Sequence, residues 1–419
     1  MERPEIAAEN NILLSVRHLT VALPEGMDRN YAVEDISFDL MAGEILCIIG
    51  ESGSGKSVTA HAAMGLLPPV LSIKQGEIIL KNQNILTSDP AVMRRVQGKT
   101  IAMIFQDPLS ALNPVMSVGK QISEVMVAHG VGTPVSRQQK VVSLLEEVGL
   151  PGPETLQHQY PFNLSGGQRQ RVMIAMALAL KPKLLIADEP TTALDVTIQG
   201  QILDLIKTLQ EEEGMAVLFI THDMGVVAEI ADRTLVMYRG EAVENGTTED
   251  IFHRPQHPYT RALLAAVPKL GSMQGRGWPL RFPQINLQTG ESAKPKEVAG
   301  TVDTGLTPLL SVRNLSARFP VYGGIFSRQV GAVHAVENIS FDLFQGETLA
   351  LVGESGCGKS TTGRAVTRLL KPHSGAIDFD GFDVMNLGKR DIMQMRQRIQ
   401  MIFQDPFASL NPRMRIGDA

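Results

Sequence analysis

The stretch that decides the fold is EILCIIGESGSGKS, residues 44–57, and a near copy of it, ETLALVGESGCGKS, occupies residues 347–360. In the first copy, a short apolar run that is typical of a buried parallel strand leads into a glycine-rich loop, and helical spacing begins where the loop ends. This order of strand, loop and helix is the context that supports a G-x-x-x-x-G-K-[ST] phosphate loop. The sequence therefore predicts a nucleotide-binding α/β fold.

The phosphate loop supplies the first candidate site residues. Its glycines let backbone N–H groups turn toward phosphate oxygens at a helix N-terminus. Lys56 is placed to reach the β- and γ-phosphates, and Ser57 is placed to bind Mg²⁺. A glycine-rich turn with a surface lysine is the alternative, which the repeated context disfavours. The candidate ATP-binding residues are Gly50, Glu51, Ser52, Gly53, Ser54, Gly55, Lys56 and Ser57, with Gly353, Glu354, Ser355, Gly356, Cys357, Gly358, Lys359 and Ser360 in the second copy.

The repetition extends well beyond the loop. Residues 32–57 align with 335–360, and residues 101–114 align with 399–412, in the same order and with nearly the same spacing. Such internal similarity indicates two homologous domains rather than two isolated loops.

The expected boundaries are 1–268 for the first domain, 269–306 for a linker and 307–419 for the N-terminal part of the second domain. The linker contains Gly, Pro and polar residues without a sustained helical or strand period. The second domain stops just past its copy of residues 101–114. We therefore expect a fragment or a prematurely ended version of a longer tandem protein, in which neither nucleotide site is completed within the chain and apolar residues of TLALVG, 348–353, are partly uncovered.

Composition narrows the function classes. The 419 residues carry 44 acidic and 39 basic side chains, for a net charge of −5, so no excess of positive charge favours nucleic acid as a partner. Two cysteines far apart in the sequence argue against a disulfide framework or a cysteine metal site and favour a reducing compartment. The longest apolar stretches, such as 172–180, are shorter than the roughly 18 residues that span a bilayer.

Two further strand ends carry titratable side chains. KLLIADEP, residues 183–190, is typical of a buried strand, and it ends in two acids. Asp188 is placed to hold Mg²⁺ through water, and Glu189 to orient and polarise the attacking water. FITHDM, residues 219–224, delivers His222 in a similar way. Solvated acids and a structural histidine are the alternatives, and a lone histidine is more often structural.

A second anion-binding pattern separates this chain from other P-loop proteins. In NLSGGQRQRV, residues 163–172, Ser165, Gly166 and Gly167 expose backbone N–H groups at the start of a predicted helix. One domain needs only one cradle for a γ-phosphate. We therefore expect the second cradle to cap a nucleotide bound by a partner domain, so that two domains enclose two ATP molecules head to tail.

With these motifs the sequence resembles the ATP-binding cassette family, across both repeats. The resemblance implies an α/β P-loop cassette with a parallel core sheet, an antiparallel β-layer near 12–48 and a helical signature subdomain at about 107–170, duplicated in tandem with an incomplete second copy. The segment 251–268 resembles part of the C-terminal extension, at about 247–268, of ATPases that serve di- and oligopeptide importers.

The resemblance also implies roles for individual residues. Glu189 and His222 are the catalytic pair, with His222 as the switch histidine at the γ-phosphate, and Asp195 belongs to the D-loop. Tyr31 and His334 loosely match the position of an adenine-stacking residue. The signature that contacts a partner's ATP is Leu164, Ser165, Gly166, Gly167 and Gln168. The implied Mg²⁺ contacts are Ser57, Gln106 and Asp188 in the first copy and Ser360 and Gln404 in the second.

The implied function is that of an ATPase that energises an importer of small peptides, with ATP and Mg²⁺ as cofactors. The implied partners are two transmembrane permease subunits and, through them, a periplasmic or extracellular substrate-binding protein, and cassettes are expected to dimerise. The implied location is the cytoplasmic face of a bacterial inner membrane, where residues 106–122, with Leu109 and Leu112, are expected to receive a permease helix. Nucleic acid is not an expected partner.

Two alternatives stay open. One is a soluble tandem ATPase that acts on ribosomes or nucleic acid, and the other is a non-catalytic regulatory cassette, suggested by the incomplete second half. Within the importer hypothesis, glutathione, dipeptides, oligopeptides and nickel chelates are not distinguished by these residues, because an importer's specificity lies in its binding protein and permeases.

Overall fold

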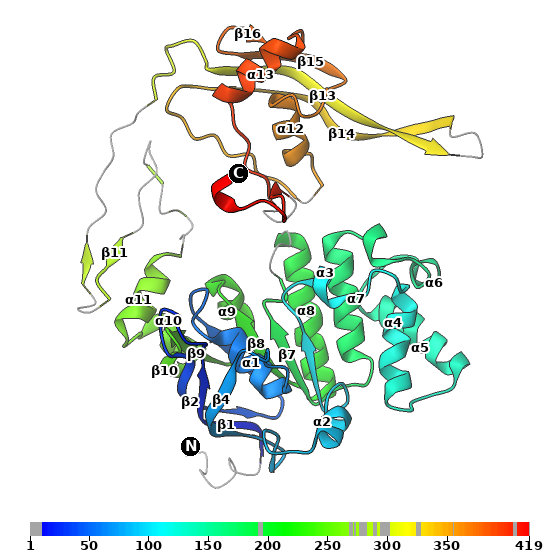
Figure 1. The fold of residues 1–419 in the computed structure, drawn as a ribbon, viewed down its shortest axis with the longest axis vertical. Coiled ribbons are helices and arrows are strands. Elements are labelled where there is room, and N and C mark those ends of the chain that lie inside the picture. Colours follow the sequence, from blue (N-terminus) through cyan, green and yellow to red (C-terminus); the bar gives the residue numbers. More distant parts are fainter. Residues whose placement is uncertain are drawn as a thin grey trace. The chain divides into compact units, whose positions relative to one another are not determined.

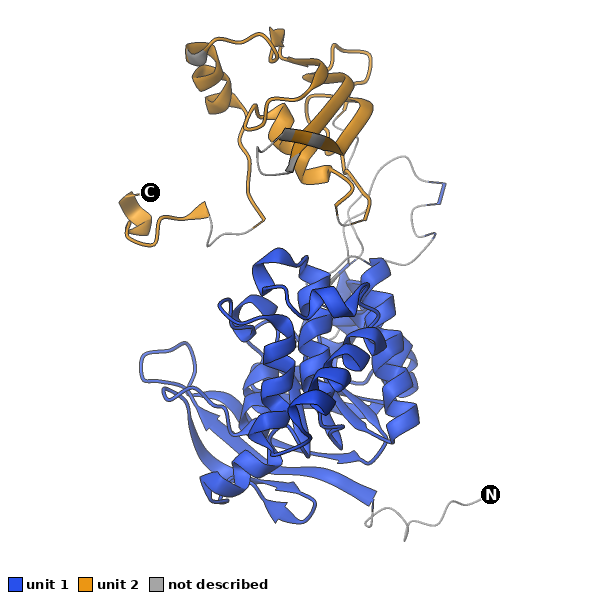
Figure 2. Ribbon diagram, turned by 90° about the vertical axis from the view of Figure 1, so that its right-hand side faces the viewer, with its two compact units in different colours: residues 1–297 blue, residues 298–419 orange. Residues whose placement is uncertain are grey.

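The computed structural model describes residues 11–191, 196–267, 271, 274–275, 283–287, 291–293, 302–323, 328–354, 356–404 and 409–418. The chain forms two compact units, Met1–Glu297 and Val298–Ala419, which are described separately (Figure 2). The division falls inside the segment 269–306. Within the described ranges, no helix combines the length and the apolar character needed to cross a membrane.

A six-stranded sheet in the order β10-β9-β3-β8-β7-β6 forms the centre of unit 1 (Figure 1). Its strands are β3 (Ile45–Ile49), β6 (Ile101–Ile104), β7 (Leu184–Asp188), β8 (Ala216–Thr221), β9 (Arg233–Tyr238) and β10 (Glu241–Thr247). All run parallel except β10, which pairs antiparallel with β9. Every residue of β3, β6, β7 and β8 is buried, because helices and a second sheet cover the two faces. The predicted parallel sheet is confirmed.

The two faces of β3 contribute to two different cores. Cys47 and Ile49 pack in the core that the helices share, whereas Leu46 and Ile48 pack in the core beneath an antiparallel sheet. This alternation is the period of two expected of a strand. The antiparallel sheet has the order β2-β1-β4-β5. Its strands are β1 (Ile12–Ala22), β2 (Tyr31–Met41), β4 (Ser72–Leu80) and β5 (Gln83–Asn84), so the layer predicted near 12–48 is present and β4 and β5 extend it.

Five helices form the insertion predicted at about 107–170 and gather on one side of unit 1 (Figure 1). They are α3 (Pro108–Ala111), α4 (Val118–Ala128), α5 (Pro134–Glu147), α6 (Pro153–Leu156) and α7 (Gly166–Leu178), with a 3-10 turn η3 (Pro161–Asn163) before α7. Two of these helices begin with reciprocal capping boxes, Thr133 with Ser136 at α5 and Ser165 with Gln168 at α7. Each box satisfies two backbone N–H groups that the first helical turn leaves free.

The other helices of unit 1 cover the sheet or follow it in the chain. They are α1 (Lys56–Met64), α2 (Pro90–Val96), α8 (Val196–Glu213), α9 (Met224–Ile230), α10 (Thr248–His253) and α11 (Pro258–Ala265), and the short strands β11 (Gln284–Ile285) and β12 (Ser292–Ala293) pair with each other. Helices α10 and α11 come from the predicted C-terminal extension.

Unit 2 contains a four-stranded antiparallel sheet in the order β14-β13-β15-β16. Its elements are β13 (Leu310–Gly323), β14 (Arg328–Leu343), β15 (Ser374–Phe379), β16 (Phe382–Asp383), α12 (Lys359–Val366), α13 (Lys389–Arg398) and η4 (Ile416–Asp418). Residues 348–353, the copy of β3, form no strand, although the structure describes all of them. The strand of the first copy is therefore not repeated in the second, and Leu349, Leu351 and Val352 are exposed, in agreement with the expectation that this segment is partly uncovered.

Candidate nucleotide-binding site

The first phosphate loop joins β3 to α1, and its glycines are required by close backbone contacts. A Cβ built on Gly50 would lie 2.2 Å from the carbonyl oxygen of Met237 in β9. A Cβ on Gly55, which caps α1 with a φ of 101°, would lie 2.5 Å from the carbonyl oxygen of Ala32. These positions admit only glycine without a shift of the backbone. The loop is therefore held between β9 and β2 in the form that opens its N–H groups at a helix start.

Lys56 lies inside this loop. Its Nζ donates hydrogen bonds to the carbonyl oxygens of Gly50 at 2.7 Å and Glu51 at 2.9 Å. Burial lowers the pKa of the Lys56 ammonium, and the nearby carboxylates of Glu189 and Asp188 oppose that shift. The ammonium is therefore fixed by the loop's own carbonyls and stands where phosphate oxygens would replace part of its lost hydration.

Ser57 and Asp188 meet across the base of the site. The Ser57 hydroxyl donates to Asp188 Oδ1 at 3.0 Å, which joins the start of α1 to the end of β7. Burial raises the pKa of Asp188, and the hydrogen bond from Ser57 opposes this. A hydroxyl and a carboxylate in contact are the oxygen donors that Mg²⁺ prefers. The residues therefore fit a Mg²⁺ site in which Ser57 and Asp188 hold the ion or its water ligands.

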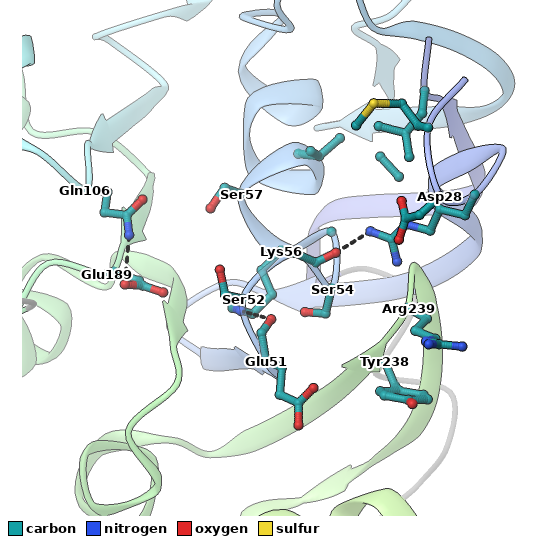
Figure 3. Close-up of a pocket in the computed structure, with 17 residues that line it drawn as sticks. Asp28, Glu51, Ser52, Ser54, Lys56, Ser57, Gln106, Glu189, Tyr238 and Arg239 are labelled. Carbon is teal, nitrogen blue, oxygen red and sulfur yellow. Dashed lines mark hydrogen bonds between the residues drawn. The ribbon is translucent and has the colours of Figure 1, made fainter. Parts of the chain in front are cut away.

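Glu189 is bracketed by the two other polar groups that the sequence singles out. Gln106 Nε2 donates to Glu189 Oε2 at 2.9 Å, and His222 Nδ1 lies 3.2 Å from Glu189 Oε1. Figure 3 shows Gln106 directed at Glu189, across from Ser57. The three residues follow the carboxyl ends of β6, β7 and β8, which are neighbours in the sheet. Ligands of open parallel sheets bind at that edge.

A cavity of about 570 Å³ lies over the loop (Figure 3). Its polar part is lined by loop residues, Gln106 and Glu189, and another part by Leu23, Met27 and Ala32. Arg29, from the turn between β1 and β2, donates to the Gly53 carbonyl oxygen and also lines the cavity. These residues were not predicted from the sequence, because nothing at their positions in LPEGMDRNYA, residues 23–32, marks a ligand contact.

Tyr31 lies beside this cavity rather than in it. It lines a neighbouring hollow together with Glu34 and Arg239. In unit 2, His334 is paired with Glu337, its Nδ1 lying 2.8 Å from Glu337 Oε1. The aromatic residue that lines the cavity over the first phosphate loop is Tyr238, and Leu23 and Met27 line it as well.

The signature residues do not line the cavity at the phosphate loop of their own domain. Leu164 is buried, whereas Ser165 and Gly166 are exposed at the start of α7. A Cβ on Gly166 would meet no atom within 4 Å among the described residues, so the backbone faces open space there. This placement agrees with a cradle that serves another domain's nucleotide. Asp195 lies outside the described residues.

The second phosphate loop repeats the local geometry of the first. Lys359 Nζ donates to the carbonyl oxygens of Gly353 at 2.6 Å and Glu354 at 2.7 Å. Gly358 caps α12 with a φ of 98°. Ser360 and Gln404 are exposed, and Ser355 lies outside the described residues. The loop and the helix start are therefore present in both copies.

Comparisons with known proteins agree with this geometry. Residues 33–192 and 336–419 match the family model described as ABC transporter. The chain belongs to the ABC transporter family. Residues 243–289 match the model described as oligopeptide/dipeptide transporter, C-terminal region. This ABC protein therefore carries the type of extension predicted from its sequence, and the family membership inferred from the motifs is confirmed.

Two relatives and one solved structure are similar to this chain in sequence or in fold. The glutathione import ATP-binding proteins GsiA of Escherichia coli (strain K12) and Shigella flexneri are each 53% identical over 416 residues, 97% of this chain. The chain spans 66% of the length of these relatives. A dimeric post-hydrolysis structure of the ATP-binding cassette MJ0796 bound to ADP and Pi has a TM-score of 0.51 and 28% identity, covering 56% of this chain and 98% of that one. These comparisons test no single residue, so the roles assigned above remain predictions.

Proposed function

We propose that this chain is the ATP-binding and ATP-hydrolysing part of an ABC importer for glutathione or other small peptides. The observation that carries the proposal is the position of Glu189, held between Gln106 and His222 at the edge of the sheet where the phosphate loop opens. A carboxylate there can accept the proton of a water molecule that attacks the γ-phosphate. Lys56 and Ser57 lie on the loop side, where the phosphates and Mg²⁺ would be held.

The same residues divide the chemistry between them. Lys56 and the loop N–H groups stabilise negative charge on the β- and γ-phosphates. Mg²⁺, when bound, neutralises charge on the same phosphates, and Ser57 and Asp188 are its expected holders. Glu189 orients the water, and His222 reaches the γ-phosphate from the end of the adjacent strand. The signature at 164–168, of which Ser165 and Gly166 are exposed, would complete the site of a second cassette, and the dimeric state of a structural neighbour supports this role.

The importer hypothesis is favoured over a ribosomal or nucleic-acid role by the C-terminal extension, which matches the oligopeptide and dipeptide transporter type. The proposed partners are two permease subunits and, through them, a substrate-binding protein, with the chain docked at the cytoplasmic face of the inner membrane. The proposed docking surface includes Leu109, whose side chain is 62% exposed. Leu112 is 3% exposed and belongs to the core, so the expectation that it also faces a permease is wrong.

Affinity purification of the tagged chain from cells that express it tests the partner class directly. We expect two integral membrane proteins with many spans to copurify in detergent, and ATP to drive glutathione uptake into vesicles that contain them. Copurification of ribosomal proteins in place of permeases would support the alternative. Uptake of other peptides but not glutathione would keep the importer and change its substrate.

A further inference from the structure

The C-terminal extension contacts the phosphate loop through one buried side chain, Tyr259 of α11. Tyr259 is 1% exposed, and its Oη accepts a hydrogen bond of 2.8 Å from the backbone N–H of Glu51. Its ring packs against Tyr238 at the end of β9, with 4.3 Å between the ring centroids. A residue 208 positions away in the sequence therefore touches the first turn of the loop.

The peptide unit that receives this contact also holds Lys56. The N–H of Glu51 and the carbonyl of Gly50 belong to one planar peptide group. Tyr259 Oη binds the N–H end, and Lys56 Nζ donates to the carbonyl end at 2.7 Å. The two contacts together fix the rotation of this peptide plane, and with it the point at which the lysine ammonium is held.

The extension is itself anchored to the central sheet. The Glu244 carboxylate on β10 accepts hydrogen bonds from the backbone N–H groups of Gln256 at 2.7 Å and His257 at 3.0 Å. The His257 side chain then caps α11 by accepting the N–H of Tyr259 at 3.2 Å. Because these contacts fix the first turn of α11, the Tyr259 hydroxyl is delivered from a rigid position.

The same face of α11 also borders the hydrolysis residues. Leu263 lies one helical turn after Tyr259, and residues four apart share a helix face. Leu263 lines a hollow together with Gln106, Glu189 and His222. The extension therefore forms part of the wall of the nucleotide site in addition to any role it has elsewhere.

We propose that Tyr259 is a positioning residue for the phosphate loop, and that its hydroxyl holds the Gly50–Glu51 peptide in the orientation that binds phosphate. The inference rests on the proposed ATP-binding function. Burial raises the pKa of Tyr259 to about 12, so the phenol stays neutral through the physiological range. Without the hydroxyl, the free loop would sample other orientations of this peptide, and ATP would bind only the competent fraction.

The test compares Tyr259→Phe with Thr260→Val in the full 419-residue chain. Thr260 is the next residue on α11, is fully buried, and its hydroxyl has no hydrogen-bond partner among the described residues. Both substitutions thus delete one buried hydroxyl from the same helix turn, but only the first deletes the contact to the loop. We expect Tyr259→Phe to weaken ATP affinity about 5- to 10-fold and to raise KM with little change in kcat. We expect Thr260→Val to stay within about twofold of the unmodified chain.

Hydrogen exchange in the nucleotide-free protein gives a second readout. A variant that only destabilised the fold would not raise exchange in the phosphate loop alone. We expect faster exchange in the peptide spanning residues 50–57 for Tyr259→Phe, and no change there for Thr260→Val. Equal ATP affinity and equal loop exchange in the two variants would overturn the inference alone. Failure of the unmodified chain to bind ATP at all would overturn the proposed function and this inference with it.

Discussion

The two phosphate-loop copies have nearly the same local sequence but different surroundings. In the first, all five residues of β3 are buried, and the strand pairs with β8 on one side and β9 on the other. In the second, the aligned residues form no strand, and Val352 is 90% exposed. The next repeated segment behaves in the same way, since β6 is fully buried whereas Ile402 in its copy is 98% exposed.

The loops themselves do not share this difference. Each lysine bonds the two carbonyls at the start of its loop, and the glycine before it caps the following helix at nearly the same φ, 101° and 98°. Loop and helix start are thus encoded locally by glycines and the lysine. A parallel strand is not encoded locally, because its backbone N–H and C=O groups must be satisfied by neighbouring strands.

The largest expected effect comes from Glu189, which lies outside the segments 32–57 and 101–114 that the second copy repeats. Glu189→Gln keeps the size of the side chain but removes the carboxylate that orients the water. We expect the hydrolysis rate to fall about 10²- to 10⁴-fold while ATP binding is nearly unchanged. Phosphate release and a direct ATP titration measure the two quantities. A normal rate in this variant would show that hydrolysis does not depend on the first copy's carboxylate.

Matched leucines test the difference in burial itself. Leu46 of β3 aligns with Leu349 of the second copy, and the former is fully buried whereas the latter is exposed. We expect Leu46→Ala to lower the free energy of unfolding of unit 1 by about 2–5 kcal/mol. We expect Leu349→Ala to change the stability of unit 2 by no more than about 0.5 kcal/mol. Denaturant unfolding of each variant measures both, and similar losses would show that residues 348–353 are packed in solution.

The same distinction between locally encoded loops and strands that need partners explains which features could be predicted from the sequence. The phosphate loop, Asp188, Glu189 and His222 were predictable, because each sits at the end of an apolar run in a recognisable motif. The cavity wall at Leu23 and the contact of Tyr259 were not. Both depend on which distant segments become neighbours when the chain folds. Neither segment carries a local sequence pattern that predicts the contact.

The exposure of residues 348–353 was predictable from the sequence, whereas the absence of a strand there was not. The run TLALVG at 348–353 has the apolar character of ILCIIG at 45–50, so the apolar pattern by itself does not distinguish the two copies. In unit 1 the strands that pair with such a run come from the distant segments 216–221 and 233–238. Pattern alone does not report whether such partners are present, and the structure does.

The two lysines test whether the shared loop geometry is sufficient for binding. We expect Lys56→Ala to weaken ATP binding at the first loop about 10- to 150-fold, because a charge-assisted contact of about 1.5–3 kcal/mol is lost. We expect Lys359→Ala to remove only the weaker of the two classes of ATP-binding site, because no formed strand anchors the second loop. Equilibrium titration resolves the two classes. Loss of the tighter class with Lys359→Ala would mean that the second loop is the better site.

The smallest expected effect on the isolated chain comes from Leu109, in the segment that follows β6. In this segment Leu112 is buried, whereas the aligned Leu410 of the second copy is 57% exposed. Leu109 itself is exposed at the start of α3, so Leu109→Glu should change stability by no more than about 0.5 kcal/mol and basal hydrolysis by less than about twofold.

If Leu109 docks a permease helix, ATP-driven uptake in vesicles should nevertheless fall about tenfold, because a charge would enter an apolar contact. Leu112→Glu should instead unfold the helical side of unit 1 and abolish both activities. Equal losses of uptake and hydrolysis in Leu109→Glu would assign the segment a structural role, as its buried neighbour has.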